Sequence, residues 1–112
     1  MPLLERVRIE VYLPDLPKRT YQDLVTALDR EFTFTFGGCT VIRGLDGSYL
    51  SQAGRMMQDK INIIYTDIPL ALSRNLSRIS SYTEHLSKAA YDALEEEAVL
   101  IAAFTVLHSN YQ

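Results

Sequence analysis

One short segment near the start of the chain restricts its fold more than any other. Within residues 6–13, RVRIEVYL, every second side chain is apolar, at Val7, Ile9, Val11 and Leu13. A period of two is typical of a β-strand with one buried face and one wetter face. Pro14 and Pro17 follow, and because proline cannot donate a hydrogen bond to a β-ladder, we expect the strand to end there. The chain therefore begins with a strand that needs a core on only one side.

The spacing of apolar residues predicts the remaining elements. Apolar residues three and four positions apart indicate two amphipathic helices, and two β-rich runs joined at Gln52–Arg55 indicate a hairpin. Phe32, Phe34 and Phe36 alternate, which leaves local strand pairing open as an alternative after the first helix. The segment AVLIAAFTVL is apolar on both faces and favours a last strand. The predicted segments are residues 20–30 and 74–96 for the helices, and residues 39–51, 57–66 and 98–107 for the strands.

The predicted elements follow the order strand, helix, strand, strand, helix, strand. With right-handed crossovers this order gives an α+β fold, a four-stranded antiparallel sheet with two helices on one face. It resembles the ferredoxin-like βαββαβ superfold, the split βαβ arrangement, over nearly the whole chain, and we expect strand order 4-1-3-2. Ile61 and Ile63 are expected to face the helices together with the apolar side of the first strand. The length fits a single domain over residues 1–112, and a superfold by itself implies no function.

Five glycines lie within residues 36–54, but their spacing matches no nucleotide-binding loop. A Walker loop contains Gly-Lys-Ser/Thr, and no Gly-Lys pair occurs in the sequence. A dinucleotide-binding loop joins a strand to a helix, whereas Gly37-Gly38 join a predicted helix to a strand. We therefore expect a helix-to-strand turn at Gly37-Gly38, a bulged strand at Gly44 and Gly47 and a hairpin tip at Gly54, with Asp46-Gly47 as a bulge or kink. The alternative for Asp46-Gly47 is a hairpin turn that adds one short strand.

Composition argues against several classes of function. The net charge of −3 provides no basic surface, so we predict neither nucleic acid nor a membrane as a partner. One cysteine makes neither an internal disulfide nor a thiolate metal cage, and we predict no metal and no cofactor. The first residues, MPLLERVRIE, lack the apolar run of a signal peptide, and no segment approaches the length of a membrane span. We expect a soluble cytoplasmic protein.

His108 is the strongest candidate for chemistry. It follows the predicted last strand, which pairs antiparallel with the first strand and places His108 near Arg6 and Arg8. The end of the third strand, at Thr66 and Asp67, is expected nearby, where a carboxylate could orient the imidazole. Two arginines and an imidazole on one sheet face would suit an anionic ligand. The predicted ligand-binding residues are Arg6, Arg8, Tyr12, Thr66 and His108, and His108 is the candidate catalytic residue.

Other chemically capable residues have simpler explanations. Cys39 lies between the glycine turn and a predicted strand, far in sequence from either histidine, so we expect a buried thiol. His85 lacks a second metal ligand at helical spacing, and we expect it to be solvated. The hairpin carries polar side chains at Tyr49, Ser51 and Arg55. These are the candidate contact residues if the hairpin contacts another protein.

The last strand predicts self-association through residues 98–107. Both of its faces are apolar, and two helices cover only one face of the sheet, so a monomer would leave an apolar strip exposed. No lysine or proline in this segment protects it as an edge strand. We expect a symmetric dimer or higher assembly, with this strand and Tyr12 near the contact.

The sequence leaves three functions open. The first is a small homo-oligomeric binding or structural module with a small-molecule ligand. The second is a cofactor-free enzyme resembling the dimeric α+β-barrel kind, which would use His108 with Arg6, Arg8 and Tyr12 on a small acidic substrate. The third is a regulatory subunit whose hairpin, residues 46–55, contacts another protein. A cleft that contains His108 and is closed by oligomerisation favours the enzyme, whereas a filled, flat sheet face favours the module.

Overall fold

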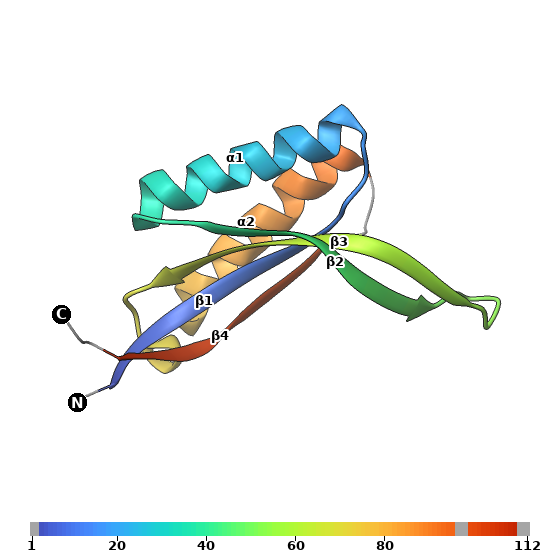
Figure 1. Ribbon diagram of the computed structural model, residues 1–112. Helices are drawn as coiled ribbons and strands as arrows, with labels where there is room; N and C mark the ends of the chain where they lie inside the picture. Colours follow the sequence, from blue (N-terminus) through green and yellow to red (C-terminus); the bar gives the residue numbers. More distant parts are fainter. Residues whose placement is uncertain (1–2, 96–98, 110–112) are drawn as a thin grey trace.

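The computed structural model describes residues 3–95 and 99–109, and its strands and helices occur in the predicted order (Figure 1). A short 3-10 helix, η1 at Leu72–Arg74, precedes the second long helix. Among the described residues no helix is long and apolar enough to cross a membrane. The bounds are Leu3–Pro14 for β1, Arg19–Phe36 for α1, Thr40–Leu50 for β2, Met56–Ile68 for β3, Leu76–Leu94 for α2 and Leu100–Ser109 for β4.

The strands form one antiparallel sheet in the order β2-β3-β1-β4, which is the predicted order read from the opposite edge. β1 is central and pairs with β3 on one side and with β4 on the other. Both α1 and α2 lie on one side of this sheet (Figure 1). The other side, which we call the open face, has no covering helix among the described residues. The predicted α+β, ferredoxin-like fold is therefore confirmed, with residues 96–98 lying outside the described part.

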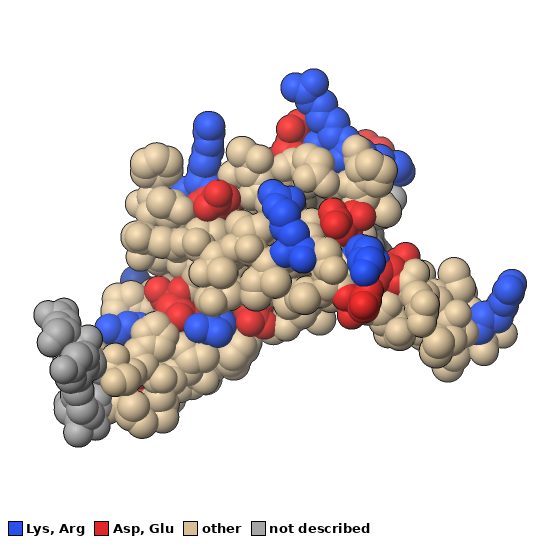
Figure 2. All heavy atoms as spheres, viewed as in Figure 1, with Lys and Arg blue, Asp and Glu red and all other residues tan. Residues whose placement is uncertain are grey.

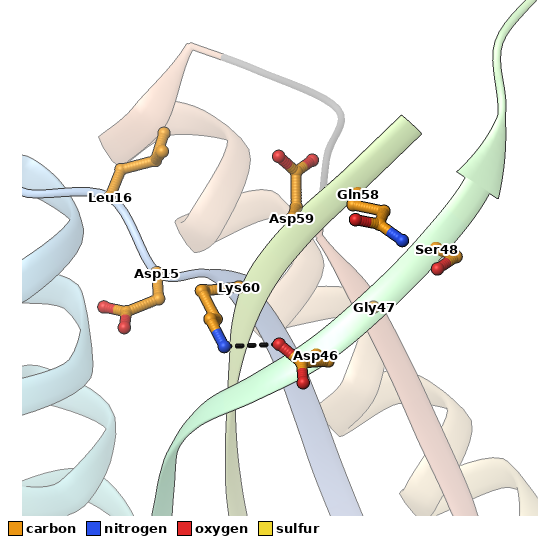
Figure 3. Close-up of a pocket in the computed structure, with 8 residues that line it drawn as sticks. All are labelled: Asp15, Leu16, Asp46, Gly47, Ser48, Gln58, Asp59 and Lys60. Atoms are coloured by element: carbon orange, nitrogen blue, oxygen red, sulfur yellow. Dashed lines mark hydrogen bonds and ion pairs between the residues drawn. The ribbon is translucent and has the colours of Figure 1, made fainter. Parts of the chain in front are cut away.

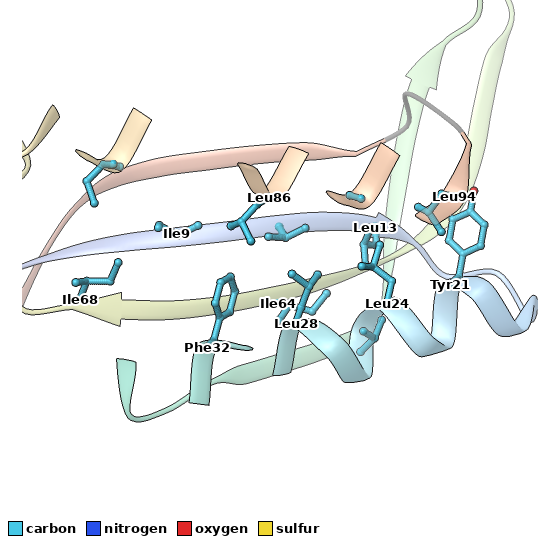
Figure 4. Packing of buried hydrophobic residues seen from close by; sticks show 14 of the residues in the cluster. Ile9, Leu13, Tyr21, Leu24, Leu28, Phe32, Ile64, Ile68, Leu86 and Leu94 are labelled. Atoms are coloured by element: carbon cyan, nitrogen blue, oxygen red, sulfur yellow. The ribbon is translucent and has the colours of Figure 1, made fainter. Parts of the chain in front are cut away.

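The core lies between the sheet and the two helices, with β1 at its centre (Figure 4). The four apolar residues that alternate along β1 are all fully buried, as their spacing predicts. Burial of a large apolar side chain stabilises a fold by about 1.5–3 kcal/mol, so the stripes of the two helices attach them firmly to the sheet. The buried helix residues are Tyr21, Leu24, Val25, Leu28 and Phe32 from α1, and Ile79, Leu86, Ala90 and Leu94 from α2.

β3 turns the opposite face to the helices from the one predicted. Directly opposed residues of antiparallel strands share a face, and the register pairs the buried Val11 with Ile64. Ile64 is therefore a core residue, and it is fully buried. Ile61 and Ile63 lie an odd number of positions away from it, so their side chains point to the open face. The prediction that these two residues contact the helices is wrong.

α1 continues beyond its predicted end at residue 30 and stops at Phe36. Phe32 is fully buried because it follows Leu28 at a spacing of four on the same helical stripe, whereas Phe34 is exposed. The alternating phenylalanines therefore belong to a helix, and the alternative of local strand pairing is wrong. Gly37 ends the helix at a φ of 93°, a left-handed conformation that glycine adopts without steric cost.

β1 ends at Pro14, but β2 and β3 continue past this point as a hairpin that no third strand of the described part joins. The β1–β3 pairing ends at Ile61, so residues 45–50 and 56–60 form a two-stranded arm, to which the loop after β1 adds one hydrogen bond, from the Asp15 amide to the Lys60 carbonyl at 2.8 Å. The arm projects well past the helices (Figure 1), and the molecule is accordingly elongated, with extents of 48 × 28 × 26 Å.

The irregularity in β2 lies at Gly44, where a bulged strand is expected, and not at Asp46-Gly47. The register shifts between Ile42 and Leu45, and Gly44 has a φ of 69°. Asp46 and Gly47 pair regularly with β3. The expected bulge or kink at these two residues is therefore misplaced, and the alternative of a hairpin turn there is wrong.

Candidate functional site

The open face of the sheet carries a largely apolar layer. An uncovered face of an antiparallel sheet is usually polar, and a contiguous exposed apolar patch marks an interaction surface. The apolar residues that alternate outward on β4 contribute to this layer, as the two-sided pattern of the last segment predicts. The large apolar side chains that are exposed on this face are Ile42, Leu45, Tyr49, Met57, Leu100 and Phe104.

A group of polar side chains interrupts this layer where β3, β1 and β4 run side by side. Arg8 of β1 lies directly opposite Asp67 of β3; its Nε donates to Oδ1 at 2.7 Å and its Nη2 to Oδ2 at 2.9 Å. His108 of β4 reaches the same carboxylate, with Nε2 2.8 Å from Oδ2. The Arg8 guanidinium also lies 4.2 Å from the centre of the Tyr65 ring. We call Arg8, Asp67 and His108 the polar cluster.

The two full charges of the polar cluster compensate each other. The Arg8 and Asp67 side chains are 25% and 16% exposed, so the pair is partly shielded from water. The hydrogen bond from Arg8 holds the pKa of Asp67 below its ordinary value, and the same bond raises the pKa of Arg8. Both groups therefore stay ionised at neutral pH. Asp67 occupies Nε and Nη2 of Arg8, so an anionic ligand could reach the guanidinium only through its remaining N–H groups and would lie beside an ionised carboxylate.

The other predicted ligand residues do not join the polar cluster. Arg6 lies on the open face, where its Nη1 donates to the backbone carbonyl of the preceding residue at 2.9 Å. The Tyr12 hydroxyl donates to Glu10 at 2.5 Å, a bond that raises the pKa of Tyr12. Thr66 is buried on the helix side, where its hydroxyl donates to the Gly38 carbonyl at 2.7 Å. Thr66 therefore lies on the opposite face of the sheet from His108.

Asp67 connects the polar cluster but is absent from the predicted ligand residues. The signal that identifies it is the period of two along β3, because Asp67 shares a face with Tyr65 and is paired with Arg8. Opposite charges directly across an antiparallel pair stabilise it. Thr66 lies on the helix face of the sheet, since a shift of one residue along a strand turns the side chain to the other face.

A groove of about 480 Å³ lies on the open face, where the arm leaves the body. Tyr12, Ile61 and Leu100 line it from the body, and Tyr49 and Asp59 line it from the arm. Its walls are mainly apolar and aromatic, with a carboxylate at one side. This is the composition of many small-molecule sites.

A second groove, of about 450 Å³, lies at the base of the arm and is more polar (Figure 3). Asp15, Asp46 and Asp59 line it, and Lys60 forms an ion pair with Asp46. Within the described ranges, no group of three or more histidine, cysteine, aspartate or glutamate residues is arranged to hold a metal ion.

The remaining candidate residues are dispersed over the molecule. Cys39 is half-buried, and burial raises the pKa of its thiol to about 12, so it is protonated and weakly nucleophilic at neutral pH. His85 is exposed on α2. At the hairpin tip, Tyr49 and Arg55 are exposed, and the Arg55 backbone amide donates to the Ser51 hydroxyl at 3.2 Å.

Comparison with known proteins supports the fold and identifies no family. No protein-family model matches the chain, and no curated protein matches it in sequence. Similar solved structures include the divalent cation tolerance protein Cut A1 from Thermus thermophilus, at a TM-score of 0.59 and 15% identity over 96% of this chain and 88% of that chain. A phage SAM lyase in complex with S-methyl-5'-thioadenosine has a TM-score of 0.58 and 13% identity over 96% and 93% of the two chains. CPII from Thiomonas intermedia, bound to ADP, AMP and acetate, has a TM-score of 0.52 and 13% identity over 98% and 94%. At these identities the likeness shows the shared ferredoxin-like fold alone.

Proposed function

We propose that the chain is a single-domain, cytoplasmic, homo-oligomeric protein that binds a small molecule. The observation that carries the proposal is the apolar layer of the open face, which neither helix covers. β4 lies at an edge of the sheet and belongs to this layer. Its Leu100 and Phe104 side chains are 62% and 37% exposed, which leaves them available to a second copy.

Assembly through the open face would remove this layer from water. A stable interface buries about 800 Å² on each partner, and if half of that area is apolar, each partner gains about 10 kcal/mol before the costs of association. The charges of β1 and β3 at the centre of the face also cancel, with Arg6 and Arg8 balanced by Glu10 and Asp67. Like-charge repulsion between two copies is therefore small.

The arm extends the proposed contact surface. Tyr49 and Met57 lie on its open face, while Leu50 and Met56 on the other face are 73% and 69% exposed. Among residues 48–58, all of which the structure describes, Arg55 is the only charged residue, and Figure 2 shows the outer part of the arm almost free of charged side chains. An isolated two-stranded ribbon is only marginally stable in water, so packing against a second copy would stabilise the arm.

The apolar groove at the base of the arm is the proposed ligand site. Its volume of about 480 Å³ falls in the range of about 300–1,000 Å³ that is usual for small-molecule sites. Tyr12 and Tyr49 offer aromatic rings, and Asp59 offers a hydrogen-bond acceptor, which suits a flat ring with a donor group. Two proteins of similar fold were solved with adenosine compounds. AMP, ADP and S-methyl-5'-thioadenosine are therefore the first probes.

Sedimentation velocity at micromolar concentration tests the assembly. The wild-type chain is expected to sediment as a dimer or a larger species, and Phe104→Lys is expected to dissociate it by placing a charge within the apolar layer. Phe34→Lys is the matched control, because Phe34 is 86% exposed on α1, away from the sheet. A monomeric wild type, or equal effects of the two substitutions, would contradict the proposed assembly.

Isothermal titration calorimetry with the three adenosine probes tests the ligand class. Binding that Tyr49→Ala weakens and Phe34→Lys leaves unchanged would support the groove. The absence of binding by all three probes would reject adenosine compounds while leaving the assembly to be judged by sedimentation.

A second candidate function is a cofactor-free enzyme that uses His108 on a small acidic substrate. The observation that favours it is the hydrogen bond between His108 and a carboxylate on the open face, an arrangement that orients a proton-transferring imidazole. In this function a second copy would close the open face into a cleft around His108.

A further inference from the structure

We propose that the polar cluster is a proton-accepting site, in which His108 Nδ1 takes a proton from a weakly acidic hydroxyl of a small molecule, with Asp67 and Arg8 as positioning residues. The inference rests on the second candidate function, the enzyme that uses His108, since that function would use the proton transfer. The hydrogen bonds that carry it belong to one chain and are independent of assembly.

Arg8 controls the orientation and the charge of Asp67. Its guanidinium donates in parallel to both carboxylate oxygens, at 2.7 and 2.9 Å, and a bidentate pair of this kind restricts rotation of the carboxylate. The guanidinium in turn lies over Tyr65, at 4.2 Å from the ring centre, which restricts Arg8 as well. Asp67 is therefore held as an ionised group that can only accept hydrogen bonds.

The ionised carboxylate determines which nitrogen of His108 carries the proton. Asp67 Oδ2 lies 2.8 Å from Nε2, and because the carboxylate has no proton to give, Nε2 must be the donor. In a neutral imidazole the other nitrogen is then an acceptor. No described residue forms a hydrogen bond with Nδ1. The lone pair of Nδ1 is therefore free to accept a proton from a ligand.

The surroundings of His108 suit proton transfer from a hydroxyl group. Its side chain is 40% exposed, so a small molecule has access to the ring. As the proton moves, the O–H bond breaks, an N–H bond forms at Nδ1, and the oxygen keeps the electron pair. The imidazolium that results is stabilised through Nε2–H by Asp67. Arg6 lies on the same face near His108, because it is two residues along β1 from Leu4, the cross-strand partner of His108, and its positive charge favours the new oxyanion.

Transfer in the opposite direction returns the proton, so the step needs no oxidant, reductant or co-reactant. The fitting ligand class is a small molecule with an ionisable hydroxyl group, such as a phenol or an enol. A carboxylic acid fits less well, since it is already ionised at neutral pH and has no proton to give.

Nitrogen-15 NMR of the two imidazole rings tests the geometry at about pH 8, above the ordinary titration range of histidine. We expect His108 with a protonated Nε2 and an unprotonated Nδ1, while the exposed His85 serves as the unconstrained reference. Asp67→Asn is expected to reduce the population of this tautomer. Asp92→Asn, at an exposed position on α2, is the matched control and should change neither ring. A protonated Nδ1 in neutral His108, or an unchanged ring in Asp67→Asn, overturns the proposal.

Absorbance of 4-nitrophenol tests the proton transfer, because the phenolate absorbs visible light and the phenol does not. The wild-type chain is expected to raise the phenolate fraction above that in buffer, and His85→Gln should preserve this rise. His108→Gln should abolish it, and Asp67→Asn should lower it toward the value in buffer. A rise that survives His108→Gln, or no rise at all, rejects the site. The proposed assembly is judged separately by sedimentation, so a monomeric chain with the expected tautomer and absorbance would refute the oligomer and support this inference.

Discussion

A double-mutant cycle measures the energy of the ion pair at the centre of the open face. It compares the wild type with Arg8→Met, Asp67→Asn and the double variant. The pair is bidentate, and its side chains are 25% and 16% exposed. The burial of this ion pair therefore lies between that of exposed pairs, which contribute about 0–1 kcal/mol, and that of fully buried pairs, whose disruption costs about 3–5 kcal/mol. We expect a coupling energy of about 1–2 kcal/mol at neutral pH from the double-mutant cycle.

Acid is expected to remove this coupling. The hydrogen bond from Arg8 lowers the pKa of Asp67 in the folded chain below the ordinary value of 3.8, so the unfolded chain takes up the proton first as the pH falls. The stabilisation by the ionised carboxylate is complete above the ordinary value and is lost as the pH falls through the folded pKa. Asparagine does not ionise, so the difference in unfolding free energy between wild type and Asp67→Asn should narrow in acid.

Urea denaturation followed by circular dichroism, at one fixed protein concentration, gives the four unfolding free energies at each pH. The matched control is the Arg19–Asp23 pair on α1, whose side chains are 93% and 69% exposed and which should show little coupling. A neutral-pH coupling below about 0.5 kcal/mol, within the error of additivity, would refute a cooperative pair. A coupling that persists unchanged in strong acid would show that it does not come from the ionised form of Asp67.

Three further predictions concern the parts of the chain that hold the fold. Burial raises the pKa of Cys39 to about 12, so iodoacetamide should alkylate the native thiol at least about tenfold more slowly than the urea-unfolded one; equal rates measured by mass spectrometry would contradict this. Asn62 is buried, accepts from the Gly44 amide at 3.0 Å and donates to Asp15 at 3.2 Å. Asn62→Leu should therefore lower the unfolding free energy by about 1–3 kcal/mol, and an unchanged urea midpoint would contradict this. Gly37→Ala places a side chain at a φ of 93° and should cost about 1 kcal/mol in the same assay, whereas a neutral or stabilising effect would refute that strain.

The order of elements is predictable from the sequence because each element carries its own periodicity. The alternation in β1 and the three-and-four spacing in α2 are local signals, and both predict the correct element. The end of α1 is harder to predict, because Phe34 and Phe36 have low helix propensity and also fit a strand. Packing against the sheet decides in favour of the helix, since Phe32 reaches the core only in that conformation.

The faces of β3 are less predictable because register is a tertiary property. Ile63 and Ile64 are equally apolar, and only the pairing of Val11 with Ile64 assigns one to the core and the other to the open face. The same uncertainty affects the candidate site. Thr66 and Asp67 are neighbours in sequence, yet only Asp67 lies on the face of His108. His108 itself is predictable because the pairing of the first and last strands follows from the fold class.

The position of the polar cluster inside an apolar layer connects the two candidate functions. A partner that covers Phe104 also covers Arg8, its cross-strand neighbour. Burying an unpaired guanidinium would cost several kcal/mol, but Arg8 already donates to Asp67 and lies against Tyr65, and these contacts need nothing from a partner. In the polar cluster, Nδ1 of His108 and Nη1 of Arg8 then still need water, a ligand or a partner atom, because no described residue forms a hydrogen bond with either. Assembly through the open face would therefore enclose a basic nitrogen in a sheltered space, which is the arrangement that proton-transfer chemistry requires.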